Sequence, residues 1–235
     1  MSDLSFLADS TQDVGVAIDE LLKARNKPRG YMGLSQAGLV NECQRKAWYM
    51  MNGYPAKEHE GRLLRLFRSG DDVETNMVLD LKDIGLTVHS CQKEVGANYG
   101  DDTLKGHIDG IIEGLDAFGL GKKPCLFECK SCNDKKFAEL KKLGDYGRWN
   151  MVYKAQVHIY ALLLKLDRIF VAVENKNTSE RYFQRFERDS DFALETLQKA
   201  FLVKKMQAPP PRCQDRPDFF SCKWCDYYNT CFGNN

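Results

Sequence analysis

Residues 106–130, GHIDGIIEGLDAFGLGKKPCLFECK, constrain the fold of this chain more than any other stretch. Two apolar segments flank a glycine-rich turn; the first contains Asp109, and the second ends with Glu128 and Lys130. Short apolar segments bounded by turn residues predict β-strands that pair side by side. We therefore expect Asp109 and Glu128 to lie close together.

Alternation along the second strand divides its side chains between two faces. Phe127 and Cys129 are expected on one face, and Glu128 and Lys130 on the other, near Asp109. Mg²⁺ and Mn²⁺ prefer oxygen ligands, which Asp109, Glu128 and the backbone carbonyl of Cys129 would supply. Lys130 is no ligand, but its ammonium suits orienting a water molecule or offsetting charge on a phosphate. The stretch thus predicts a divalent metal site suited to phosphodiester hydrolysis.

The remaining segments predict helices and strands that extend and cover this sheet. The predicted helices are residues 13–25, 35–54, 62–82, 134–144, 149–166 and 191–205. The predicted strands are residues 86–99, 103–114, 124–132, 168–176 and 181–189, the first two as an antiparallel pair. The inner stripe of the third helix is predicted to comprise Leu63, Leu66, Phe67, Val73, Met77 and Leu81. This order predicts an α/β fold with a central mixed β-sheet flanked by helices.

Two of the helices bring further polar residues toward the predicted site. Glu74 lies near the apolar stripe of its helix and is a candidate metal ligand, although a Glu on an amphipathic helix is most often solvated. Gln156 and Tyr160 lie one turn apart and project from the same side. They suit hydrogen bonding to a nucleic-acid backbone; the alternative is that they are polar residues at a helix edge.

Charge and hydropathy exclude some partners. The chain has 34 basic and 33 acidic residues, so no global field indicates a nucleic-acid or membrane partner, and any basic surface must be local. No run of about 18 apolar residues occurs, and the N-terminus lacks the pattern of a signal peptide. We expect a soluble cytoplasmic protein without a membrane partner.

Nine cysteines are many for a chain in a reducing compartment, where thiols more often bind metal than form disulfides. A tail beyond the three prolines at 209–211 contains Cys213, Cys222, Cys225 and Cys231, whereas Cys43 stands alone near the start. Soft thiolates suit an iron-sulfur cluster or zinc. A zinc knuckle formed by the four tail cysteines is one possible site. The cysteines of the third strand are expected to be small buried residues.

At these residues the chain resembles the PD-(D/E)xK nuclease superfamily, in its RecB-like branch. The matching motifs are Gly106-His107-Ile108-Asp109-Gly110, Glu128-Cys129-Lys130 and Gln156-Val157-His158-Ile159-Tyr160, and Gly70-Asp71-Asp72-Val73-Glu74 is similar to an upstream helical motif, with Glu where the branch has His or Glu. The resemblance implies a restriction-endonuclease-like core. Its implied catalytic residues are Asp109, Glu128, Lys130, Gln156 and Tyr160. Its implied metal ligands are Glu74, Asp109, Glu128 and the carbonyl of Cys129.

The cysteines extend the resemblance to RecB-like nucleases with a four-cysteine [4Fe-4S] cluster, which include the CRISPR adaptation nuclease and phage-encoded relatives. It implies Cys43, Cys222, Cys225 and Cys231 as cluster ligands and Cys213 as a spare thiol; Zn²⁺ is the alternative metal. The expected parts are an N-terminal helical segment (1–60), the nuclease core (61–206) and a Cys-rich cluster segment (207–235) packed on the N-terminal helix that carries Cys43.

The expected function is a Mg²⁺- or Mn²⁺-dependent deoxyribonuclease, an exonuclease on single-stranded DNA or DNA ends. A non-catalytic DNA-binding or adaptor subunit with the same fold is the alternative. DNA is the expected partner, with recombination or CRISPR adaptation proteins and a homo-oligomer left open, in a bacterial, archaeal or phage-infected cell. Trp149 and Tyr153 are candidates for stacking on bases. Candidate phosphate contacts are Arg45, Lys46, Lys135, Lys136, Lys141, Lys142 and Arg148.

Overall fold

The computed structural model describes residues 11–26 and 32–233. The α-helices are α1 (Thr11–Arg25), α2 (Gln44–Met51), α3 (Gly61–Asp83), α4 (Asp134–Leu143), α5 (Tyr146–Trp149), α6 (Met151–Leu163), α7 (Ser190–Lys204), α8 (Phe220–Lys223) and α9 (Tyr228–Phe232). The 3-10 helices are η2 (Leu34–Asn41) and η3 (Leu115–Phe118). The strands are β1 (Thr87–His89), β2 (Glu94–Tyr99), β3 (Asp102–His107), β4 (Gly110–Glu113), β5 (Cys125–Cys132), β6 (Arg168–Asn175) and β7 (Arg181–Glu187).

A five-stranded mixed sheet forms the centre of the molecule, with strand order β1-β4-β5-β6-β7. β5 and β6 pair in parallel, and the other neighbours pair antiparallel. Because β5 and β6 lie in the middle of the sheet and are covered on both faces, they are apolar along most of their length. The predicted mixed α/β sheet is confirmed.

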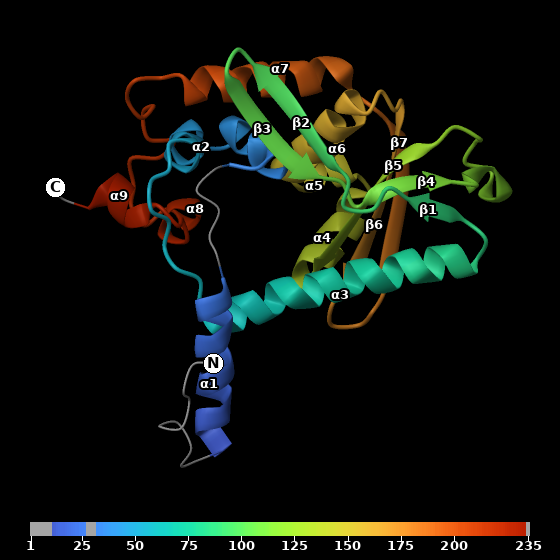
Figure 1. Cartoon of the computed structure of the whole chain (residues 1–235), viewed down its shortest axis with the longest axis horizontal. Coiled ribbons are helices and arrows are strands. Elements are labelled where there is room, and N and C mark those ends of the chain that lie inside the picture. The colour runs from blue at the N-terminus through green and yellow to red at the C-terminus, as the bar shows by residue number, and fades with distance from the viewer. Residues whose placement is uncertain (1–10, 27–31, 234–235) are drawn as a thin grey trace.

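Helices cover the two faces of this sheet unequally (Figure 1). On one face α3 packs against β5 and β1, with Met77 and Leu81 buried against Phe127 and Cys129. On the other face α6 packs against the sheet, and η2 and α7 pack against α6. No helix among the described residues has the length and apolar character to cross a membrane.

The predicted antiparallel pair of long strands is shorter in the structure. The hairpin β2–β3 is present but forms its own two-stranded sheet, while β1 and β4 pair in the main sheet. Ser90 and Gln92 adopt positive φ angles of 55° and 58°, which interrupt the first strand, and a bend at Asp109 interrupts the second. Asp109 therefore lies at a bend and not within a strand.

The predicted helix over 35–54 is also interrupted. It divides into η2 and α2, with Cys43 extended (φ −147°) as the N-cap of α2. The Cys43 thiol accepts a hydrogen bond from the backbone N–H of Lys46 at 3.4 Å. Gly38 explains the position of η2, because a Cβ there would lie 2.7 Å from Ala155 and from the backbone of Val152 on α6. Cys43 thus lies between two elements rather than inside one.

The helix α3 has the predicted bounds but only half of the predicted stripe. Met77 and Leu81 are buried, whereas Leu66 is 40% exposed and Phe67 is 51% exposed. Figure 1 shows that the first half of α3 runs beyond the sheet and meets α1. An apolar stripe is buried only where a sheet lies against it, so the prediction was wrong for Leu66 and Phe67.

The tail contacts α2 and the segment that follows it. Tyr49 of α2 stacks on Tyr227 with 5.7 Å between ring centroids, and its hydroxyl donates to the carbonyl of Thr230. The backbone N–H of Lys57 donates to the carbonyl of Asp226 at 2.8 Å. These contacts join the segment around α2 to the tail, beside the central sheet.

Candidate active site

Glu128 of β5 is the centre of the candidate site. Its side chain is fully buried. Oε1 accepts hydrogen bonds from the Lys130 ammonium and, at 2.6 Å, from Nε2 of Gln156 on α6. Oε2 is buried and has no hydrogen-bond partner in the described part of the chain. Because unpaired buried carboxylate oxygens are costly, Oε2 is available to a ligand that the protein alone does not supply.

Asp109 lies beside Glu128 because of the strand register. Gly110 of β4 is opposite Phe127 of β5, so the next pair along the antiparallel ladder is Asp109 and Glu128. Oδ2 of Asp109 accepts from the backbone N–H of Cys129 at 2.8 Å. In an extended strand the N–H and C=O of one residue point to the same edge, so the carbonyl of Cys129 also faces Asp109. The prediction that these groups lie together is confirmed.

Glu74 reaches the site from α3. Its Oε1 accepts from Nε2 of Gln92 at 2.9 Å. Burial, followed by the negative charge of Asp109, raises the pKa of Glu74 to about 7. Asp71, one turn earlier on the same helix, is close enough to raise the pKa of Asp109 as well. The carboxylate of Glu74 therefore faces the same site as the two strand residues.

The carboxylates of the site repel one another. Burial, followed by the charge of Asp109, raises the pKa of Glu128 to about 8, and burial raises the pKa of Asp109. Burial alone would lower the pKa of Lys130, but the charges of Glu128 and Asp109 hold that pKa well above its ordinary value. One ammonium thus faces at least three acidic groups, which favours an additional positive charge at the site.

Hard oxygen donors and an unpartnered carboxylate oxygen fit a divalent cation. Within residues 11–26 and 32–233, no three His, Cys, Asp or Glu side chains are spaced to hold a metal ion by themselves. Mg²⁺ in proteins commonly binds one or two carboxylates and keeps water as further ligands. Asp109 and Glu128 fit that pattern, with the carbonyl of Cys129 beside them.

Gln156 and Tyr160 of α6 lie beneath the site and not on its surface. Gln156 is 5% exposed and donates to Glu128, whereas Tyr160 is 1% exposed. The Tyr160 hydroxyl packs against the backbone of Gly106, where a Cβ would overlap it. Both side chains are therefore placed to support the strands and carboxylates, not to contact a substrate directly.

Tyr146 and Gln92 belong to this site, and sequence reasoning missed both. Tyr146 is fully buried, its hydroxyl has no partner among the described residues, and burial and the charge of Glu128 raise its pKa. It begins the four-residue helix α5, which carries no recognisable pattern. Gln92 lies at a positive φ in a short connection between strands, so periodicity gives no signal for it either.

The two aromatic candidates for base stacking are differently placed. Trp149 is 8% exposed, and its Nε1 donates to the carbonyl of Lys136 at 3.1 Å, so the structure contradicts a stacking role for Trp149. Tyr153 is half-buried, with the Lys130 ammonium 5.4 Å from its ring centroid. Three of the candidate phosphate contacts, Lys46, Lys136 and Lys141, form ion pairs with Asp226, Glu139 and Glu180.

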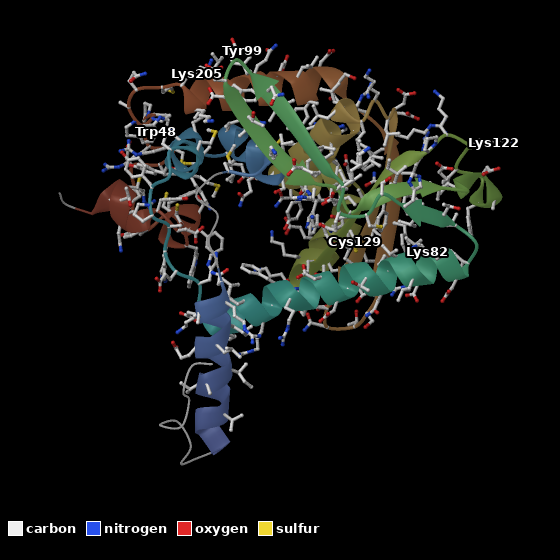
Figure 2. All side chains as sticks on the ribbon, viewed as in Figure 1. Trp48, Lys82, Tyr99, Lys122, Cys129 and Lys205 are labelled. Carbon is white, nitrogen blue, oxygen red and sulfur yellow. The ribbon has the colours of Figure 1, made fainter. Side chains whose placement is uncertain are left out.

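A second candidate site lies between α2 and the tail. Five cysteines line one pocket of about 290 Å³: Cys43, Cys213, Cys222, Cys225 and Cys231. Burial, followed by the neighbouring thiols of Cys43 and Cys222, raises the pKa of Cys213, so the expected spare thiol lies within the group. Figure 2 shows sulfur atoms gathered around α2, away from the labelled Cys129. The strand residues Cys125 and Cys129 are buried, as expected, whereas Cys132 is only half-buried.

No family model matches the chain, and no curated protein matches its sequence. Among solved structures, an alkaline exonuclease (LHK-Exo) from Laribacter hongkongensis is similar over 78% of this chain and 90% of that one, with 15% identity and a TM-score of 0.50. SSO0001 aligns over 94% of this chain and 98% of that one, with 14% identity and a TM-score of 0.49. LHK-Exo in complex with dAMP aligns over 78% and 89%, with 14% identity and a TM-score of 0.47.

The likeness to LHK-Exo concerns the fold. Together with the mixed sheet and its covering helices, it shows that the chain has a restriction-endonuclease-like nuclease fold. Because β4 and β5 are neighbours in the sheet and α6 packs beneath β5, the acidic residues and this helix form one site.

Proposed function

We propose that this protein is a metal-dependent DNA nuclease. The observation that carries the proposal is the environment of Glu128: a fully buried carboxylate with one oxygen held by Lys130 and Gln156 and the other without a partner. A purely structural carboxylate would have both oxygens paired. The unpaired oxygen and the neighbouring Asp109 instead suit a cation and a phosphate.

Asp109, Glu128, the carbonyl of Cys129 and, from α3, Glu74 would hold Mg²⁺ or Mn²⁺. When bound, the cation acts as a Lewis acid and lowers the pKa of a bound water. Lys130 offsets negative charge that builds on the phosphate and orients the attacking water. Gln156 fixes Glu128, and Tyr160 supports the strand β3 from below.

We further propose that the substrate is single-stranded DNA or a DNA end. The similar fold of an alkaline exonuclease supports this, since the name of that protein describes cleavage from ends. The phosphodiester bond is broken when water adds to phosphorus and the leaving oxygen takes up a proton, which leaves one phosphomonoester and one hydroxyl end.

At the thiol pocket we propose a [4Fe-4S] cluster held by Cys43, Cys222, Cys225 and Cys231. Soft thiolates suit iron-sulfur clusters, and Cys43 comes from the opposite end of the chain to the other three. A cluster there would hold α2 and the tail together. The alternative is Zn²⁺ bound by the tail cysteines. A visible absorption spectrum distinguishes the two, because an iron-sulfur cluster absorbs visible light and Zn²⁺ does not.

The test of the nuclease is cleavage of end-labelled single- and double-stranded oligonucleotides, with Mn²⁺ or with a chelator. Cleavage is expected in the presence of Mn²⁺ and not in the presence of the chelator. Asp109→Ala should abolish it, whereas Asp116→Asn, an exposed acid on η3, should leave it unchanged. Binding without cleavage, equal in wild type and Asp109→Ala, would favour the non-catalytic DNA-binding or adaptor subunit.

A further inference from the structure

Phe67 is an exposed aromatic residue on the helix that carries Glu74. Its side chain is 51% exposed, although the pattern of α3 gives it an inward position. The reason is geometric, since the first half of α3 runs beyond the sheet (Figure 1). An exposed aromatic ring offers a face on which a base of a single nucleic-acid strand can stack.

Phe67 and Glu74 share one face of α3. At about 100° per residue they differ by only about 20° around the helix axis, and they lie about 10 Å apart along it. Gly70 lies between them on the same face, and a Cβ there would meet only the Ser131 hydroxyl at 3.7 Å. No side chain at position 70 therefore stands between Phe67 and Glu74 on this face of α3.

The ring of Phe67 has a fixed neighbour. His59 packs edge-on against it, with 5.4 Å between ring centroids and an interplanar angle of 83°. A T-shaped neighbour covers at most one face of the phenyl ring, and Phe67 is half exposed, so a face of Phe67 is left for another planar group.

Basic residues flank Phe67 along α3, and Arg62 lines one pocket with His59, Glu58 and Glu60. Arg62 and Arg68 are exposed and form no ion pair with any described carboxylate. Lys176 donates from Nζ to the carbonyl of Leu66 at 3.3 Å, which brings a third positive charge to the same part of α3. Asp71 and Asp72 lie at the other end, next to Glu74. An aromatic face with flanking cations matches the chemistry of a single nucleic-acid strand.

We propose that Phe67 is a stacking platform for a base of single-stranded DNA that leads into the acidic site. The inference rests on the proposed nuclease function and specifies the form of its substrate. Arg62, Arg68 and Lys176 contact the phosphates beside that base, and Gly70 leaves room for the strand to reach Asp109 and Glu128.

The test is binding of a fluorescein-labelled oligothymidine to the full protein, in Ca²⁺ to prevent cleavage. Loss of one stacked base costs about 1–3 kcal/mol, so Phe67→Ala should raise Kd roughly 5- to 150-fold. Phe67→Trp should keep Kd near the wild-type value, because a larger ring also stacks. Leu79→Ala, which removes an exposed apolar side chain from the same helix, is the matched control and should have no effect.

A second readout identifies stacking itself. An oligonucleotide with 2-aminopurine at successive positions should show quenching at one position on binding to the wild type, and no quenching there with Phe67→Ala. Equal Kd for wild type and Phe67→Ala would overturn the proposal, as would failure of the wild type to bind a single strand. Thermal unfolding of each variant confirms that it is folded.

The outcomes separate the platform from the nuclease. Cleavage of DNA with Kd unchanged in Phe67→Ala would leave the nuclease standing and remove the platform. Loss of binding in Phe67→Ala without cleavage by the wild type would keep the platform and remove the nuclease.

Discussion

At the scale of single residues, the site depends on how Glu128 is held. Its oxygens have unequal surroundings: Lys130 and Gln156 donate hydrogen bonds to one, and no described group donates a hydrogen bond to the other. This asymmetry leaves the second oxygen available to the proposed cation. Gln156 is thus a positioning residue, since its amide touches Glu128 and is itself buried.

Gln156→Ala is therefore expected to reduce the rate of DNA cleavage by roughly 10- to 100-fold, a loss of about 1.4–2.8 kcal/mol of transition-state stabilisation. The effect should appear mainly in kcat, because Gln156 does not reach the substrate. Steady-state kinetics on a labelled single strand measure it, with Gln36→Ala, an exposed amide on η2, as the control. An effect on KM alone would contradict this role.

His158 predicts how stability depends on pH. Burial, followed by the charge of Lys154, lowers the pKa of His158 to about 4 from 6.5, and Nδ1 accepts from the backbone N–H of Asp189. The neutral form is favoured in the folded state, so its contribution is complete above pH 6.5 and is lost as the pH falls toward 4. The loss is up to about 1.4 kcal/mol per pH unit.

Urea unfolding of wild type and His158→Asn at several pH values between 7 and 4.5 tests this expectation. Asn keeps an acceptor for Asp189 but does not titrate in this range. The difference in unfolding free energy between the two proteins should therefore shrink as the pH falls. If the difference in unfolding free energy stayed constant over this pH range, the ionisation of His158 would not contribute to stability.

At the scale of elements, short interruptions decide the geometry of the site. The bend at Asp109 and the break before α2 place two candidate ligands at ends of elements, where side chains can turn toward a site. Close packing also matters here, since Gly106 of β3 lies against the Tyr160 hydroxyl of α6.

Gly106→Ala is expected to destabilise the protein by about 1–3 kcal/mol, because its Cβ would overlap the Tyr160 hydroxyl. Tyr160→Phe removes that hydroxyl, so the double variant should regain part of the loss. Thermal unfolding of the wild type, the two single variants and the double variant gives the coupling free energy between Gly106 and Tyr160. Additive effects would mean that the two groups do not meet.

Much of this arrangement could be predicted from the sequence, because periodicity reports which residues are covered. The strands β5, β6 and β7, the pairing of Asp109 with Glu128 and the opposite faces of Phe127 and Glu128 followed from alternation alone. The interruptions at Ser90, Cys43 and Asp109 could not be predicted in this way, since they depend on packing between elements that are distant in sequence. Leu66 and Phe67 were misplaced for the same reason: a stripe does not show where the sheet ends.

At the scale of the whole molecule, two segments that are far apart in the sequence meet at the thiol pocket. Cys43 precedes α2 and the other four cysteines of the pocket follow the core, yet all five line one pocket. Metal binding there would link these two segments and add its binding energy to the folded state.

The proposed ligand set makes one cysteine dispensable. Cys43→Ser and Cys222→Ser should lose iron and visible absorption and lower the melting temperature, whereas Cys213→Ser should retain all three properties. Iron analysis and absorption spectra of anaerobically purified variants measure this. Loss of metal in Cys213→Ser but not in Cys43→Ser would instead identify the knuckle formed within the tail.

The central claim is that Glu128 serves hydrolysis and not merely the fold. Its most direct test is the single-turnover rate of cleavage of an end-labelled single strand at saturating Mn²⁺, for wild type and Glu128→Gln. The substitution keeps the shape of the side chain and removes its charge. The account predicts a rate at least about 100-fold lower in a variant that is still folded. Cleavage by Glu128→Gln at the wild-type rate would contradict it.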